Sequence, residues 1–188
     1  MHSARRSRID RGIMSRAVRS RRLASPVRLT LAAALGEDLD GAWWPHTASI
    51  ARELPDLIDA LSARLGEIVD ISVNWSSLQG PPDLDAVRRA SMADPVRIIC
   101  HQRLMAITGS RASANLLVVP CRTSNPLAGM IMRQAATRDI VPAEQDSDAF
   151  RCADDIVRAA RAESTLCARR LRDDGLADVG TADSETTV

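Results

Sequence analysis

Two adjacent tryptophans constrain this chain more than any other feature. They stand in the run DGAWWP at residues 40–45, in a chain of 188 residues with three tryptophans, one Phe and no Tyr. Neighbouring side chains in an extended segment point in opposite directions, so one ring can enter the core while the other lies at the surface. We therefore expect one tryptophan to anchor the following helix to a sheet. The other is expected to be partly exposed beside Asp40 and His46.

The composition is that of one small globular domain. A length of 188 residues suggests a single domain, and the 45% hydrophobic content is enough for one core. No run of about 18 apolar residues is present, so the sequence predicts no transmembrane helix. All 25 basic residues are arginine, which together with abundant alanine indicates a high-GC bacterial source. Because such a bias can place arginines on a surface without a function, charge alone is weak evidence of function.

The cysteines and histidines argue against a metal or cofactor site. The three histidines lie far apart, and no Cys-x-x-Cys pair occurs among the four cysteines, Cys100, Cys121, Cys152 and Cys167. This spacing lacks the ligand pairs of structural zinc sites. No glycine-rich phosphate-binding motif is present either. We therefore expect no metal, no cofactor, and reduced thiols in a cytoplasmic protein.

The two ends of the chain differ from its middle. Residues 176–188 contain acidic but no basic residues, and we expect a disordered tail there. Residues 1–25 are expected to form a disordered arm, rich in arginine: Arg5, Arg6, Arg8, Arg11, Arg16, Arg19, Arg21 and Arg22. Three interpretations of the arm stay open. It is a plain extension of the chain, an organelle-type transit peptide, or a segment that binds nucleic acid or anionic lipid without sequence preference.

Hydrophobic periodicity predicts a single α+β domain over residues 26–140. Val69, Ile71, Val73 and Trp75 alternate with polar residues, which indicates a strand with one wet face. The segment at residues 115–119 is apolar on both faces and is expected in the centre of the sheet. The full set of expected strands is 27–31, 68–75, 96–101, 104–108 and 115–120.

Three helices are expected around these strands. Apolar residues at helical spacing predict helices over 47–65 and 126–138. Together with the strands they form a small antiparallel or mixed sheet of four to five strands, with the helices packed on one face. A thin apolar stripe predicts a peripheral helix over about 148–172, within the segment 141–175.

Four motifs resemble a family of uncharacterised proteins from high-GC, actinobacterial genomes. The motifs are RLTL at 28–31, DGAWWP at 40–45, ELPDLIDAL at 53–61 and LLVVP at 116–120. DGAWWP followed by ELPxLxxxL is the most specific part of the pattern. The resemblance implies membership of a domain-of-unknown-function family and implies no activity.

Few residues suggest chemistry. Cys100 and His101 are adjacent on an expected strand, so their side chains point to opposite faces and cannot share a proton there. Asp40 beside the indole rings either acts as an acid with a raised pKa or forms an Asp-Gly turn. His46 either binds a ligand or is an exposed residue near a helix start.

The sequence thus favours a non-enzymatic module over an enzyme. We expect it to bind a protein or a small ligand near the Trp43–Trp44 segment, through Asp40, Trp43, Trp44 and His46. The alternative is a nucleic-acid-associated protein that uses the arginine-rich arm. An enzyme whose site is not visible in the sequence is the third hypothesis, and the oligomeric state is left open.

Overall fold

The computed structural model of the chain describes residues 26–75, 84–85 and 102–179, with only the backbone from 170 onward. Three expectations lie outside these residues: the arm at 1–25, the strand at 96–101, and the tail beyond residue 179. The rest of the expected domain can be compared directly with the structure.

The centre of the fold is a five-stranded mixed sheet. Its order is β1-β2-β5-β4-β3, with β2 parallel to β5 and all other neighbours antiparallel. The expected α+β class and strand number are confirmed. The strands are β1 (Leu29–Leu31), β2 (Gly41–Trp43), β3 (Ile68–Val73), β4 (Leu104–Gly109) and β5 (Ser113–Val118).

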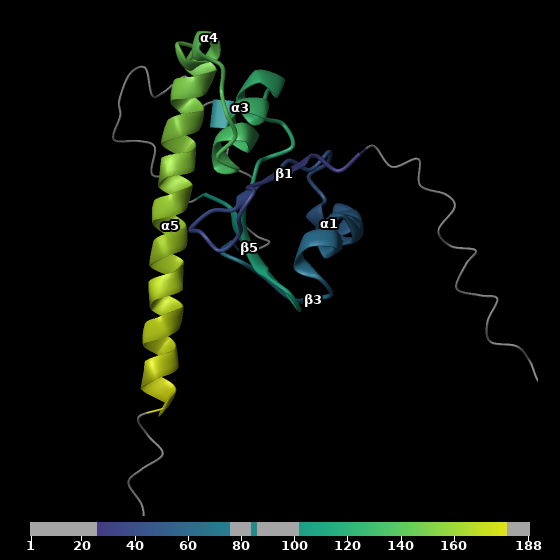
Figure 1. Cartoon of the computed structure of the whole chain (residues 1–188), viewed down its shortest axis with the longest axis vertical. Coiled ribbons are helices and arrows are strands. Elements are labelled where there is room, and N and C mark those ends of the chain that lie inside the picture. The colour runs from purple at the N-terminus through teal and green to yellow at the C-terminus, as the bar shows by residue number, and fades with distance from the viewer. Residues whose placement is uncertain (1–25, 76–83, 86–101, 180–188) are drawn as a thin grey trace, which may run out of the picture.

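Helices cover both faces of this sheet, and the expectation of helices on one face is wrong. In Figure 1, α1 lies on one side of the strands, and α3 and α5 lie on the other. The strand β5 explains this arrangement because it places apolar side chains on both faces of the sheet. Leu116 and Val118 belong to the α1 side, whereas Leu117 and Val119 belong to the α3–α5 side. The helices are α1 (Ile50–Leu65), α3 (Asn125–Ala135), α4 (Pro142–Gln145) and α5 (Asp148–Val179).

The tryptophan pair follows the same alternation. Trp43 lies in the core cluster of α1, whereas Trp44 lies in the cluster of α3 and α5. Both are buried, with 1% of Trp43 and 8% of Trp44 exposed. The expectation that one of them is partly exposed is therefore wrong. Each face of the sheet is covered by its own helical layer. The side chains on both sides of this strand therefore point into a core.

The long helix α5 belongs to the core over its first half. Its buried residues lie at helical spacing and pack with α3: Cys152, Ala153, Ile156, Val157 and Ala160. The helix was expected to be peripheral because its apolar stripe is thin and its other faces are charged. Small side chains instead allow α5 to approach α3 closely. The helix runs on to Val179, past the expected end near residue 172.

The strand β3 departs from simple alternation. A register shift against β4 falls between Ile68 and Asp70, so Ile68 and Ile71 both face the α1 cluster. Val69, expected on the buried face, is 71% exposed. A bulge of this kind adds one residue and reverses the direction of the side chains that precede it.

Gly41 permits the close pairing of β1 and β2. Its φ is +155°, and a Cβ atom there would lie 2.1 Å from the carbonyl oxygen of Thr30. No side chain fits at that distance, so a glycine is required two residues before Trp43.

Both tryptophans should be essential to stability. We expect Trp43→Ala and Trp44→Ala each to lower the free energy of unfolding by about 3–5 kcal/mol, the usual cost of truncating a buried aromatic ring. The measurement is denaturant unfolding, with exposed Val69→Ala as the control, expected within about 0.5 kcal/mol of the parent. A loss below about 1 kcal/mol for either tryptophan would contradict the two-sided core.

Candidate functional site

Asp40 is a structural residue at the end of the turn that leads into β2. It is fully buried. Its Oδ1 accepts hydrogen bonds from the backbone N–H groups of Gly36 (2.7 Å) and Glu37 (3.0 Å), and its Oδ2 accepts one from Asn115 (2.8 Å). The expected Asp-Gly turn is not formed, because Gly41 begins β2; the carboxylate instead closes the turn that precedes it, at residues 36–40. The carboxylate also joins this turn to β5.

Arg28 covers the ring of Trp44. Its guanidinium lies 3.6 Å from the ring centroid and donates to the carbonyl oxygens of Trp44 (3.0 Å) and Pro45 (2.6 Å). A guanidinium stacked on an indole is a favourable cation–π contact. The indole is thus enclosed by the core on one side and by Arg28 on the other.

His46 is exposed, and its neighbourhood is organised by Glu53 of α1. The Glu53 carboxylate accepts hydrogen bonds from the backbone N–H groups of His46 (2.8 Å) and Thr47 (2.6 Å) and from the Thr47 hydroxyl (2.7 Å). The His46 Nε2 lies 3.2 Å from the carbonyl oxygen of Pro26. These contacts hold the loop that precedes α1.

The four residues expected to form a site do not converge on one point. Asp40 precedes β2 and His46 follows it, while Trp43 and Trp44 point to opposite faces of the sheet. A ligand role for any of them stays a prediction. The same holds for nucleic-acid binding by the arm and for the Cys100–His101 pair, which lie outside the described residues.

An open groove lies instead beside the end of α3. Its volume is about 420 Å³, within the range of small-molecule sites. It is formed by the C-terminal end of α3, the loop that follows it, α4 and α5. The lining residues are Gln134, Thr137, Arg138, Asp139, Ile140, Gln145, Phe150, Asp154, Val157 and Arg161.

The backbone conformation of Thr137, in the wall of the groove, is unusual. The N–H of Arg138 bonds the carbonyl of Arg133 (2.9 Å), and the N–H of Thr137 bonds that of Gln134 (3.1 Å). This pair of hydrogen bonds is the Schellman ending of a helix, in which glycine normally occupies the left-handed position. Here that position is Thr137, with φ +51°. A β-branched residue in this region is strained.

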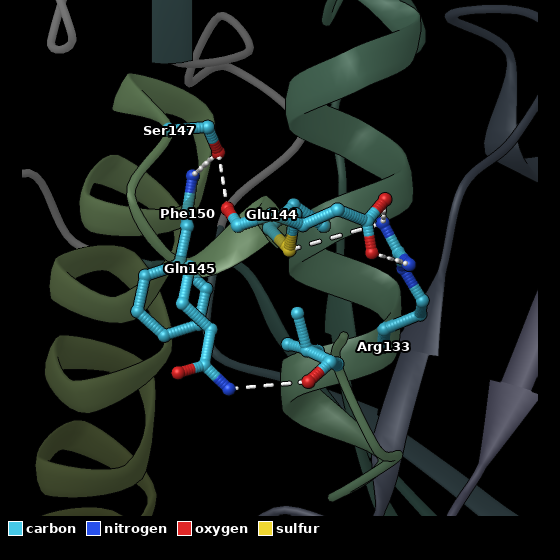
Figure 2. A network of polar contacts seen from close by, with 7 residues as sticks. Arg133, Glu144, Gln145, Ser147 and Phe150 are labelled. Atoms are coloured by element: carbon cyan, nitrogen blue, oxygen red, sulfur yellow. Dashed lines mark hydrogen bonds and ion pairs between the residues drawn. The ribbon is translucent and has the colours of Figure 1, made fainter. Parts of the chain in front are cut away.

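The wall formed by α4 is fixed by polar contacts (Figure 2). Arg133 and Glu144 form a two-pronged ion pair at 2.7 and 3.0 Å. The hydrogen bonds with Arg133 lower the pKa of Glu144 below its ordinary value. The hydroxyl of Ser147 accepts a hydrogen bond from the N–H of Phe150 (3.1 Å) and starts α5. The Nε2 of Gln145 donates to the carbonyl of Ile140 (3.1 Å).

The groove is not among the sites that the sequence predicts, although the sequence contains two signals of it. Phe150 is the only phenylalanine of the chain, and it follows a Ser147 that can begin a helix. The strain at Thr137 gives no such signal, because a threonine after a helix is unremarkable in a sequence.

Metal binding and membrane insertion find no support in the described part of the chain. No group of three or more His, Cys, Asp or Glu residues there is placed to hold a metal ion. None of the helices there is long and apolar enough to cross a membrane.

Comparison with known proteins decides the family. The model of a family of unknown function, DUF5994, matches residues 28–135, more than half of the chain. The chain belongs to DUF5994. The resemblance to a domain-of-unknown-function family is thereby confirmed. No curated protein and no solved structure matches the chain.

The DUF5994 match covers β1 to α3 and includes Asp40, Trp43, Trp44 and His46. Of the ten groove residues only Gln134 lies within it, since the other nine follow residue 135. Membership of DUF5994 therefore accounts for the sheet and its two tryptophans. The second wall of the groove comes from the part of the chain that follows the matched region.

Glu53 should make the stability of this DUF5994 protein depend on pH. Desolvation raises the pKa of Glu53, but its hydrogen bonds with His46 and Thr47 outweigh this, and the pKa lies below its ordinary value. The contribution of Glu53 is therefore complete above the unfolded-state pKa of about 4.3 and is lost as the pH falls through the folded-state pKa.

We expect Glu53→Gln to lower the free energy of unfolding at pH 7 and to flatten its decline between about pH 5 and pH 3. Urea unfolding at several pH values measures this difference. Glu67→Gln, a change of an exposed carboxylate next to α1, is the control and should keep the parent profile. If the pH profile of the unfolding free energy of Glu53→Gln also runs parallel to that of the parent, the carboxylate does not hold the loop.

Proposed function

We propose that this chain is a cytoplasmic, non-enzymatic module that binds a small ligand in the groove between α3 and α5. The observation that carries the proposal is the left-handed Thr137 in the groove wall. A strained backbone costs of order 1–3 kcal/mol and occurs mainly at binding and catalytic sites. Glycine would make the same helix ending without that cost, so the threonine side chain stands in the groove wall at a cost to stability.

The frame of the groove supports binding. The ion pair between Arg133 and Glu144 holds α4 against α3. The Nε2 of Gln134 donates to the carbonyl of Phe150 (3.1 Å), and this bond connects α3 to α5. A ligand that meets a preformed wall loses less free energy to ordering the protein. The walls therefore favour a ligand of small, defined shape.

The core beneath the groove connects it to the tryptophan pair. Val157 lines the groove and belongs to the same core cluster as Trp44. Trp44 thus supports the helices that form the groove, although its own ring is enclosed. The sequence suggested a ligand near the Trp43–Trp44 segment. This proposal instead places the ligand in the groove, on the helical layer that Trp44 supports.

The lining favours binding over catalysis. Its described residues include arginine, aspartate, glutamine, threonine and apolar side chains, but neither His nor Cys. Histidine is the most frequent acid–base group and cysteine a frequent nucleophile in active sites. The groups present are suited to orienting a ligand.

A direct test is a titration of the full chain with a fragment library, followed by amide chemical shifts. We expect hits whose shift changes are confined to the groove, around Thr137–Ile140 and Gln145–Phe150. Gln145→Trp, designed to fill the groove, should abolish those changes, with amide shifts outside the groove as the check that the variant stays folded. If no fragment perturbs these amides, or if Gln145→Trp leaves the changes unaltered, the proposed function is wrong.

Thr137→Gly should separate stability from binding. Replacing threonine by glycine at φ +51° relieves strain, and we expect the free energy of unfolding to rise by about 1 kcal/mol. The same change should weaken the fragment hits because the side chain that lines the groove is lost. Thr165→Gly, inside α5, is the contrasting variant and should destabilise by roughly 0.3 kcal/mol, the difference between threonine and glycine in helix propensity. A destabilised Thr137→Gly would show that the residue is not strained.

A further inference from the structure

We infer that the ligand of the α3–α5 groove carries a small oxyanion, a carboxylate or a phosphate-type group, which Arg161 and Arg138 bind. This inference rests on the proposed function and adds the chemical class of the ligand. It follows from an account of which polar groups in the groove are already used within the protein and which are free for a ligand.

The amide groups of the groove are already committed. The Nε2 of Gln134 donates to the carbonyl of Phe150, and the Nε2 of Gln145 donates to the carbonyl of Ile140, both at 3.1 Å. These two side chains hold the walls together. The charged donors that the lining offers a ligand are the guanidinium groups of Arg138 and Arg161.

Arg161 is held only loosely. Its Nη2 lies 3.4 Å from the carbonyl oxygen of Gln134 and 3.5 Å from the hydroxyl of Thr137. Both distances exceed the usual 2.7–3.2 Å of an N–H···O hydrogen bond. A guanidinium has five N–H donors, so most of those on Arg161 remain available beside the strained Thr137.

Arg138 is anchored at one end. Its Nη2 donates to the carbonyl oxygen of Leu31 on β1 at 3.1 Å. This bond crosses from the loop after α3 to the edge of the sheet and fixes where the guanidinium lies. Arg138 also lines the groove, next in sequence to Thr137.

Two carboxylates line the groove together with these two cations. Asp154 is paired with Arg158, which also bonds Asp155. Asp139 is exposed, next to Arg138. The lining therefore carries no excess of positive charge, and the preference for an oxyanion rests on the free donors of Arg161 and Arg138. Arginine also suits oxyanions by geometry, because its planar fork matches the two oxygens of a carboxylate or phosphate.

The rest of the lining gives the ligand an apolar part. Ile140, Phe150 and Val157 line the groove beside the polar groups. An aromatic ring with one charged substituent fits this division and the volume of about 420 Å³. Benzoate and phenylphosphonate are therefore suitable anionic probes, and benzamide is the neutral probe of the same shape as benzoate.

A purely structural role for Arg161 makes a different prediction. A cation near the C-terminal end of a helix stabilises that end through the helix dipole, and Arg161 lies near the last carbonyl groups of α3. In that case Arg161→Gln lowers stability, but the preference between benzoate and benzamide stays unchanged. The measured preference, and not stability alone, is therefore the deciding quantity.

The experiment compares dissociation constants of the three probes by chemical-shift titration of the full chain. We expect benzoate or phenylphosphonate to bind at least about tenfold more tightly than benzamide, in line with the strength of charge-assisted hydrogen bonds. Arg161→Gln and Arg138→Gln should each remove most of this preference and leave benzamide within about twofold of the parent. Arg151→Gln removes the same charge from an exposed position on α5 outside the groove lining and should leave all three constants unchanged.

Equal binding of benzoate and benzamide in the groove would overturn the inference and leave the proposed function standing. The inference would also be overturned if Arg161→Gln and Arg138→Gln both kept the parent's preference for benzoate over benzamide, provided that thermal unfolding shows both variants to be folded. If none of the three probes shifts the groove amides at about 10 mM, the inference also falls. The fragment library then decides separately whether the groove binds anything.

Discussion

The pairing of β2 with β5 is the constraint on which the rest of this structure depends. Both strands carry apolar side chains in both directions, and Trp43 and Trp44 extend this two-sided character across the sheet. A strand of this kind cannot leave one face in water, because the second large ring would be exposed. Layers of helix are therefore required on both faces. The pairing of α3 with α5, and hence the groove, follows from the layer that covers Trp44.

Arginine side chains also hold backbone segments together in this chain, which contains no lysine. Arg64 donates to the carbonyls of Ala32 and Ala33, at 2.7 and 2.6 Å, and Arg111 donates to those of Ser62 and Ala63, at 3.0 and 2.8 Å. Arg28 makes the same kind of contact with two successive carbonyls. A planar fork reaches two neighbouring acceptors, which a lysine ammonium cannot do as rigidly. These three arginines are therefore structural, and Arg161 differs from them because its own contacts are long.

The class of the fold could be predicted from residue patterns, but its layering was not. Alternation and helical spacing located β3, β5 and α1 to within a few residues, because each covers three or more periods of its own pattern. The strand β2, with three residues, covers fewer than two periods. The two-sided apolar character of residues 115–119 was recognised, yet its consequence, helices on both faces, was not drawn. The groove depends on a contact such as Arg138 to Leu31, separated by 107 residues, which no local pattern can indicate.

Native-state hydrogen exchange of the β2–β5 pairing tests the central claim most directly. The N–H of Asp40 bonds the carbonyl of Asn115 (2.8 Å), and the N–H of Val119 bonds that of Trp43 (2.9 Å). If both faces of the sheet depend on this pairing, these two amides exchange only when the whole domain unfolds, with the free energy of global unfolding. Exchange at a free energy several kcal/mol lower, while amides of α3 and α5 stay protected, would show that the helical layers hold together without the two-sided strand.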